Sequence, residues 1–271
     1  MDYALRRDKV IAEINNLSYG VTDFRKRLYW GSFVNASCFI PSIIEQREVY
    51  NFFNCFDSLI ALYQSKYETL IEYKRGILQK MFPKEGEKKP EIRFSGFNDP
   101  WEQRKVGEIA DRYDNLRVPV AASERVPGST PYYGANGIQD YVDGYTHDGE
   151  FVLIAEDGAN DLKNYPVQYT TGKIWVNNHA HVLQGKEKII DNKFLGYSIN
   201  ATNIESLLVG GGRAKLNAEV MMGIELLVPS YPEQCKISEV LFGLDNLITL
   251  HQRKCEELKE HKKGLLQQMF V

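Results

Sequence analysis

The chain has 271 residues, 43% of them hydrophobic, which is enough to bury the core of one large domain or of two modest ones. Its 33 Lys and Arg against 36 Asp and Glu give a net charge of −3 and a pI of about 6.0, which excludes a protein that binds nucleic acid through general positive charge. Residues 100–228 hold 12 Lys and Arg against 17 Asp and Glu, so any phosphate contacts must come from local clusters.

The first residues, MDYALRRDKVIAEINN, lack the apolar core of a signal peptide. No stretch of the chain approaches the roughly 20 apolar residues that a membrane span needs. The four cysteines are widely scattered and form no CxxC pair, so they predict neither a zinc knuckle nor a disulfide framework. We therefore predict a cytoplasmic protein with no metal, no cofactor and no membrane partner.

Residues 41–83 are predicted to form one long helix. A Pro-Ser pair and an acidic first turn open it, and it has no internal proline. Side chains of one stripe recur at alternating spacings of four and three, which indicates the seam of a coiled coil. These seam residues are Val49, Phe53, Phe56, Ile60, Tyr63, Tyr67, Leu70, Lys74, Ile77 and Met81.

A charged linker containing Pro and Gly is predicted over residues 84–99, and it leads into a globular domain over residues 100–228. The segment PYYGANGIQDYV, residues 131–142, predicts a strand, a tight turn and a second strand, because Asn-Gly supplies the positive φ that hairpin turns need. The turn could present Asn136 to an adenine, which an Asn side chain bonds twice, although an Asn before Gly more often serves the turn itself. Arg112, Arg117 and Arg125 precede this turn as a loose positive set that could hold a DNA backbone.

Two further segments of this domain carry polar side chains beside apolar runs. FVLIAEDG, residues 151–158, predicts a buried strand that ends at Glu156 and Asp157, which we interpret as turn residues able to accept from cytosine N4; a metal site in a hydrolase is the alternative. WVNNHAHVL places His179 and His181 on one face of an extended segment, as zinc ligands would be, but a third ligand is hard to find. Hydrogen bonding within a sheet is the favoured interpretation, followed by contact with DNA.

The end of the domain holds the best phosphate or base candidates. KFLGYSINATNIESLL, residues 193–208, predicts an amphipathic helix, and GGGRAKLN follows it. Glycines permit close approach of the backbone, and an Arg can clamp a phosphate or read a guanine with two bonds, although a solvated loop charge is the default interpretation. The predicted DNA-contacting residues of the whole domain are Arg125, Tyr132, Tyr133, Asn136, Asn177, Asn178, His179, Arg213 and Lys215.

Residues 229–271 repeat residues 41–83 without a gap, at a constant offset of 188. The second copy is therefore also predicted to be a long helix, with its seam in the same register. Its seam residues are Ile237, Leu241, Leu244, Ile248, His251, Cys255, Leu258, Lys262, Leu265 and Met269. Because the spacer is long enough for a domain, the two helices are predicted to pack antiparallel, as a rod of about 55 Å that fixes a distance. A simple oligomerisation element is the alternative.

The repeat also extends backwards, because Val21, Arg25, Arg27 and Leu28 align at the same offset with residues 209, 213, 215 and 216. Residues 1–40 therefore match the closing segment of the domain at 100–228, and we interpret them as the remnant of a first such domain. The predicted fold class is α+β: a strand-rich mixed domain flanked by two long helices that form an antiparallel coiled coil.

The stretch PEIRFSGFNDPWEQRKVGEIA, residues 90–110, resembles the passage into the second target-recognition domain of Type I restriction-modification specificity subunits, and the two helices resemble that family's spacers. Segments 131–142, 151–158, 172–185 and 213–217 resemble parts of its recognition domains. The resemblance implies two domains that each read half of a split target in double-stranded DNA, modification subunits that methylate adenine, and restriction subunits that join through the holoenzyme. This chain departs from that pattern by keeping one complete recognition domain.

The leading hypothesis is thus a non-catalytic DNA-recognition subunit that reads a half-site and docks the modification methyltransferase. The sequence shows no Asn-Pro-Pro-Tyr tetrapeptide, no GxxxxGK[ST] and no GxSxG, so an independent enzyme is disfavoured. Two copies could pair, or the chain could be an inactive cassette. The alternatives from other classes are a coiled-coil scaffold whose domain binds a protein or small ligand, and a metal-dependent hydrolase built on Glu156, Asp157, His179 and His181.

Overall fold

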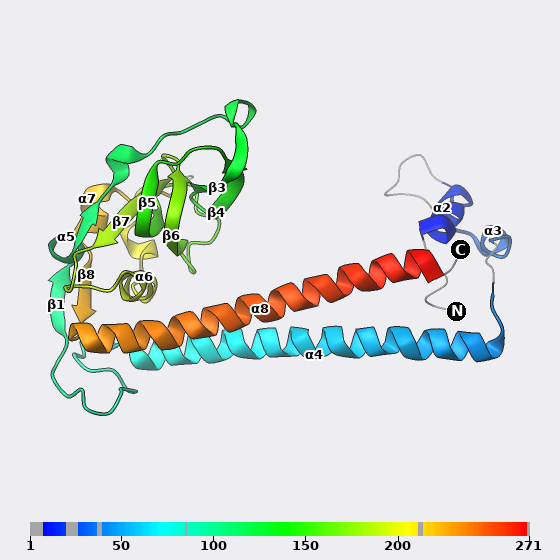
Figure 1. The fold of residues 1–271 in the computed structure, drawn as a ribbon, viewed down its shortest axis with the longest axis horizontal. Helices are drawn as coiled ribbons and strands as arrows, with labels where there is room; N and C mark the ends of the chain where they lie inside the picture. Colours follow the sequence, from blue (N-terminus) through cyan, green and yellow to red (C-terminus); the bar gives the residue numbers. More distant parts are fainter. Residues whose placement is uncertain (1–7, 20–26, 37–39, 85, 211–213, 270–271) are drawn as a thin grey trace. The chain divides into compact units, whose positions relative to one another are not determined.

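The computed structural model describes residues 8–19, 27–36, 40–84, 86–210 and 214–269 (Figure 1). The chain divides into two compact units: residues 1–72 with 245–271, and residues 73–244. Each of the two long helices contributes residues to both units. None of the helices in the described ranges combines the length and the apolar composition of a membrane span.

The first unit is helical. Its described elements, including the two helices that continue into the second unit, are α2 (Asp8–Asn16), α3 (Trp30–Phe33), α4 (Ile43–Met81) and α8 (Tyr231–Met269). The two long helices begin in the same way, which explains one identity of the sequence repeat. Gln46 Nε2 donates to the carbonyl oxygen of Pro41 (2.8 Å), and Gln234 Nε2 donates to that of Pro229 (2.9 Å). Each glutamine thereby satisfies a carbonyl at a helix start.

The predicted seam residues of the two long helices are mostly buried or partly buried, and two pairs of them and their neighbours lie in contact. Every predicted seam residue of α4 is buried or partly buried, with Phe53 fully so. Within the first unit, Lys262 pairs with Asp57, and the ring of His251 lies 5.5 Å from that of Tyr63. Residue numbers rise along α4 as they fall along α8, so the helices are antiparallel as predicted. On α8 the predicted seam extends too far, because Met269, in the last turn, is 45% exposed.

The second unit is the strand-rich part. Its elements between the long helices are β1 (Glu102–Lys105), α5 (Val106–Ile109), β2 (Ala110–Arg112), η2 (Asp114–Leu116), η3 (Ala122–Glu124), β3 (Pro127–Gly134), β4 (Gly137–Val142), β5 (His147–Ala155), β6 (Val167–Val176), β7 (Ala180–Gly185), α6 (Asn192–Asn200), η4 (Glu205–Leu207), α7 (Ala218–Met222) and β8 (Glu225–Val228). One sheet has the order β2-β7-β5-β6-β3-β4, with β3 and β6 parallel and the other neighbours antiparallel. A separate β1–β8 pair joins the two ends of this region, Glu102 lying opposite Val228.

β5 lies in the middle of the core, which explains its uninterrupted apolar sequence. Alternate side chains point to opposite faces of a strand. Val152 and Ile154 join a cluster with α6, whereas Phe151 and Leu153 join a second cluster with β6 and β7. Both faces are buried, as the sequence predicts for FVLIA.

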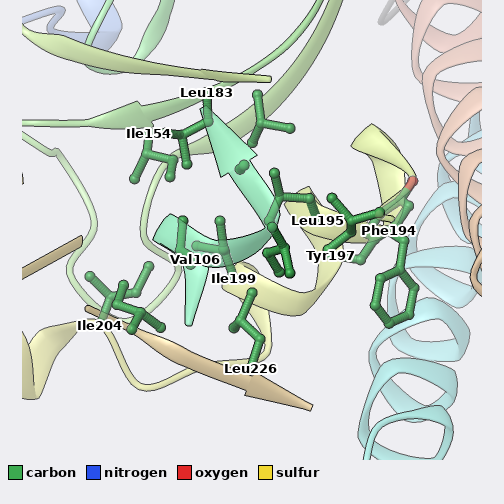
Figure 2. Close-up of a cluster of buried hydrophobic side chains, with 14 of the residues drawn as sticks. Val106, Ile154, Leu183, Phe194, Leu195, Tyr197, Ile199, Ile204 and Leu226 are labelled. Carbon is green, nitrogen blue, oxygen red and sulfur yellow. The ribbon is translucent and has the colours of Figure 1, made fainter. Parts of the chain in front are cut away.

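α6 covers the first of these clusters, where Phe194, Leu195 and Ile199 pack near Ile154 and Leu183 (Figure 2). Asp191 caps the helix by accepting from the backbone N–H of Phe194 (2.8 Å). The prediction of an amphipathic helix over 193–208 is wrong in two respects. All of 194–199 is buried, because β5, β6, β7 and β8 surround it, and the helix ends at Asn200 before a separate 3-10 turn.

Candidate nucleic-acid interface

Hydrogen bonds gather four segments that the sequence separates widely: residues 134–139, 156–160, 177–179 and 214–216, together called the loop cluster below. Asn136 Nδ2 donates to the carbonyl oxygen of Gly158 (2.9 Å), and Asn136 Oδ1 accepts from the backbone N–H of Asn160 (2.9 Å). The backbone N–H of residue 216 donates to the carbonyl oxygen of Glu156 (2.8 Å). The loop cluster thus unites most of the predicted DNA-contacting positions on one part of the second unit.

Asn136 confirms the predicted turn and at the same time serves a structural purpose. Gly137 after it has a φ of 109°, a backbone conformation that favours glycine and explains the Asn-Gly pair. The side chain of Asn136 is exposed, but its two bonds fasten the segment after β5. The side chain of Asn136 therefore has a structural use, but it bonds a segment more than 20 residues away rather than the turn that it was predicted to serve.

The β6–β7 connection presents Asn178 and His179 at the surface. Asn177 is 4% exposed and holds the connection from within: its Oδ1 accepts from the backbone N–H of His179 (2.8 Å) and its own N–H donates to the carbonyl oxygen of Tyr133 (3.0 Å). Asn178 is exposed. The imidazole of His179 is 37% exposed, and its Nδ1 lies 2.5 Å from Oδ1 of Asp157.

Beside these residues lies a group of five ionisable side chains, here called the ion cluster: Asp114, Arg117, Glu156, His181 and Lys215. Arg117 Nη1 donates to Oε2 of Glu156 (2.8 Å), and Lys215 Nζ donates to Oε1 of the same carboxylate (2.8 Å). His181, 1% exposed, bonds Asp114 Oδ2 through Nδ1 (2.7 Å) and the carbonyl oxygen of Leu216 through Nε2 (2.9 Å). The ion cluster therefore ties η2, the end of β5, β7 and residues 215–216 to one another.

The groups of the ion cluster shift one another's pKa values. Burial raises the pKa of Asp114, but the hydrogen bonds from His181 and from the backbone N–H of Val182, with the charges nearby, outweigh it and leave this pKa lowered. Burial also raises the pKa of Glu156, but the hydrogen bonds from Lys215 and Arg117 outweigh this effect, so the pKa of Glu156 is lowered. The hydrogen bond to Glu156 raises the pKa of Lys215. Both carboxyl groups are thereby held in their charged form.

These shifts predict acid sensitivity. A carboxyl group with a lowered pKa in the folded state contributes stability above its unfolded pKa of about 4 and loses that contribution as pH falls through the lower folded pKa. We expect Asp114→Asn to lower the free energy of unfolding by about 2 kcal/mol at pH 7 and to flatten its decline below about pH 4. Urea unfolding between pH 7 and pH 3 measures this. Asp143→Asn, an exposed carboxylate outside the ion cluster, is the control; an equal effect of both substitutions would contradict the prediction.

The four residues of the metal-hydrolase alternative do not converge on one point, although His181 Nδ1 lies 3.7 Å from Glu156 Oε2. His179 pairs with Asp157, while His181 pairs with Asp114, a residue that the sequence analysis did not single out. Asp114, Glu156 and His181 do place one ligand atom each within 4.8 Å of one another, as metal ligands would. The same carboxylates, however, already bond Arg117 and Lys215, so this donor set is balanced by cations of the chain itself.

Several predicted DNA-contacting residues lie inside the unit. Tyr132 is 1% exposed, with its hydroxyl between the N–H and carbonyl groups of Val120. The guanidinium of Arg125 stacks 4.1 Å above the Tyr132 ring and bonds Val120 and Asp140. A side chain so enclosed has no face left for a base or phosphate. We therefore do not propose that Tyr132, Arg125 or the buried Asn177 contacts DNA. Tyr133 is half-buried, and that burial raises its pKa.

Two of the basic residues that were predicted to contact DNA pair with Glu156 instead. Arg117, predicted to hold the DNA backbone with Arg112 and Arg125, is engaged in the ion cluster and its side chain is 15% exposed. Lys215 keeps 45% of its side chain exposed but pairs with Glu156. Arg213 lies outside the described residues. No sequence motif indicates the Asp114–His181 pair, because its two members lie 67 positions apart in the chain.

Comparison with known proteins gives one family throughout. A family model described as the Type I restriction modification DNA specificity domain matches residues 98–260. The chain is 47% identical over 146 residues to the type I restriction enzyme specificity subunit S.HindORF215P of Haemophilus influenzae, which covers 54% of this chain and 38% of that protein. It is 23% identical over 298 residues to the MjaVIII specificity subunit of Methanocaldococcus jannaschii, covering 97% of this chain and 67% of that one. The chain thus spans well under half of the first relative and about two thirds of the second.

Among solved structures, the crystal structure of a Type I restriction-modification S subunit from M. genitalium matches with a TM-score of 0.71 at 17% identity. The match covers 99% of this chain and 71% of that one. At this level of identity the likeness concerns the fold, and it supports the predicted class of a strand-rich mixed domain with two long helices.

Proposed function

Because the chain belongs to the family of Type I restriction modification DNA specificity domains, whose model matches more than half of it, we propose that it recognises one half of a DNA target and catalyses no reaction itself. The recognition domain is proposed to be residues 100–228. The observation that carries this proposal is the loop cluster, in which side chains able to bond base edges are held on a stiff support.

The chemistry of the loop cluster suits direct readout. Amide and imidazole groups bond base edges in the major groove, where each base pair shows a distinct pattern of donors and acceptors. Asn178 and His179 offer such groups at the surface, on a connection that buried Asn177 fixes from below. Affinity for phosphate requires additional cations, for which Arg213 remains a candidate.

The long helices are proposed to dock modification methyltransferase subunits, through which restriction subunits would join. Exposed apolar side chains on one side of α4, such as Phe52, Leu59 and Leu62, support a protein partner on these helices, because water-facing apolar stripes favour association. Pairing of two copies through the same helices is the alternative, and it would place two identical half-sites about a two-fold axis.

The test is methylation mapping in cells that produce the cognate modification subunit with and without this chain. A bipartite adenine-methylation motif found only with the chain supports the proposal, and a palindromic motif would indicate paired copies. A stable complex with the modification subunit that yields no motif would overturn the recognition role. If the chain forms neither a complex nor a motif, the scaffold hypothesis replaces it.

A further inference from the structure

The Asp157–His179 pair is the most distinctive chemical feature of the loop cluster. The backbone of His179 is fixed on both sides. Its N–H donates to Asn177 Oδ1, and its carbonyl oxygen accepts from the N–H of Glu156 (2.8 Å). Asp157 follows Glu156 directly in the chain, and its backbone forms an isolated antiparallel β-bridge with Lys215. The imidazole therefore has a defined position, while more than a third of it stays exposed.

The carboxylate decides which nitrogen of the imidazole carries the proton. An ionised Asp only accepts hydrogen bonds, so the 2.5 Å contact places the proton of the neutral ring on Nδ1. In the neutral imidazole, Nε2 then carries a lone pair and can accept a hydrogen bond. Within the described residues, no side chain or backbone group bonds this Nε2, so it is available to a ligand.

His181 shows by contrast what a purely structural histidine looks like in this fold. Both of its ring nitrogens bond acceptors of the chain, and it is 1% exposed. The pair formed by Asp157 and His179 also differs from a hydrolytic triad, because no Ser, Thr or Cys of the described residues bonds Nε2 to serve as a nucleophile. An oriented acceptor on a surface is suited to recognising a donor.

We propose that His179 is a specificity-determining residue whose Nε2 accepts a hydrogen bond from the exocyclic amino group of an adenine or a cytosine, and that Asp157 is a positioning residue that fixes the required tautomer. In the major groove, these amino groups are the donors that separate adenine and cytosine from guanine and thymine, which show acceptors there. The inference rests on the proposed function, since it names the chemistry that the loop cluster reads.

The experiment is selection of duplexes from a random library by the full chain in complex with its modification subunit. We expect His179→Ala to keep the motif but to lose about tenfold discrimination at one adenine or cytosine position. Asp157→Asn should relax the same position, because an Asn amide can donate to Nδ1 and allow the other tautomer. Asp143→Ala, which removes an exposed side chain of the second unit outside the loop cluster, is the control and should leave the motif unchanged.

Base analogues test the same contact without altering the protein. Replacing each motif adenine with purine, or each cytosine with 2-pyrimidinone, removes the exocyclic amino group alone. One such replacement should weaken wild-type binding about tenfold and leave the binding of the His179→Ala protein unchanged. If the wild type selects a motif but every replacement weakens both proteins equally, the inference is overturned and the proposed function stands. If the wild type selects no motif, the proposed function itself fails.

Discussion

Replacing Arg93 with alanine is expected to destabilise the second unit by about 3–5 kcal/mol, because it leaves the carboxylate of Glu233 buried without its partner. Arg93 Nε donates to Oε1 of Glu233 (2.7 Å) and Nη2 donates to Oε2 (2.8 Å), the two-point geometry that makes such pairs strong. The side chain of Glu233 is 0% exposed, and the hydrogen bond to it raises the pKa of Arg93. The pair fastens the linker after α4 to the first turn of α8.

Urea unfolding of the full chain, followed by tryptophan fluorescence, measures this effect, since Trp101 and Trp175 both lie in the second unit. The matched control is the double variant Arg93→Met with Glu233→Met, which removes both charges and should cost less than the single substitution. A loss below about 1 kcal/mol in Arg93→Ala would show that water or another group replaces the guanidinium, and it would contradict the prediction.

The second large effect is expected from Trp101→Ala, at about 3–5 kcal/mol. Trp101 is 1% exposed, and its ring packs against Phe82 at 5.9 Å and Phe194 at 5.8 Å. Phe82 and Phe194 also stack at 5.6 Å, so three rings join the end of α4, the start of the strand-rich region and α6. Truncation would open a cavity where these elements meet.

Trp101→Phe distinguishes packing from other causes of destabilisation. The indole Nε1 is buried without a hydrogen-bond partner among the described residues, so a phenylalanine loses contact area but also removes an unsatisfied donor. We expect its cost to be less than half that of the alanine variant. Thermal and urea unfolding of both variants measure the difference. Equal costs would contradict the cavity explanation.

The sequence alone predicted the features that depend on local periodicity. Seam positions such as Phe53 and Ile60 follow from a spacing of four and three, and the repeat at residues 229–271 predicted an antiparallel partner in the same register. The apolar run at 151–155 predicted a strand buried on both faces, and Asn-Gly at 136–137 predicted a turn with a positive φ. These features are set by side chains close together in the chain, which one sequence displays.

Only the tertiary structure decided which polar side chains remain available to a ligand. Tyr132 and His179 both stand beside apolar strands in the sequence, yet one is enclosed by Arg125 and Val120 while the other keeps a ring nitrogen at the surface. Likewise, the pairing of His181 with Asp114 depends on β7 meeting the η2 turn, 67 positions away in the sequence. Burial and long-range hydrogen bonds decide such roles. Both arise only when the sheet assembles, so the periodicity and spacing of the sequence do not predict them.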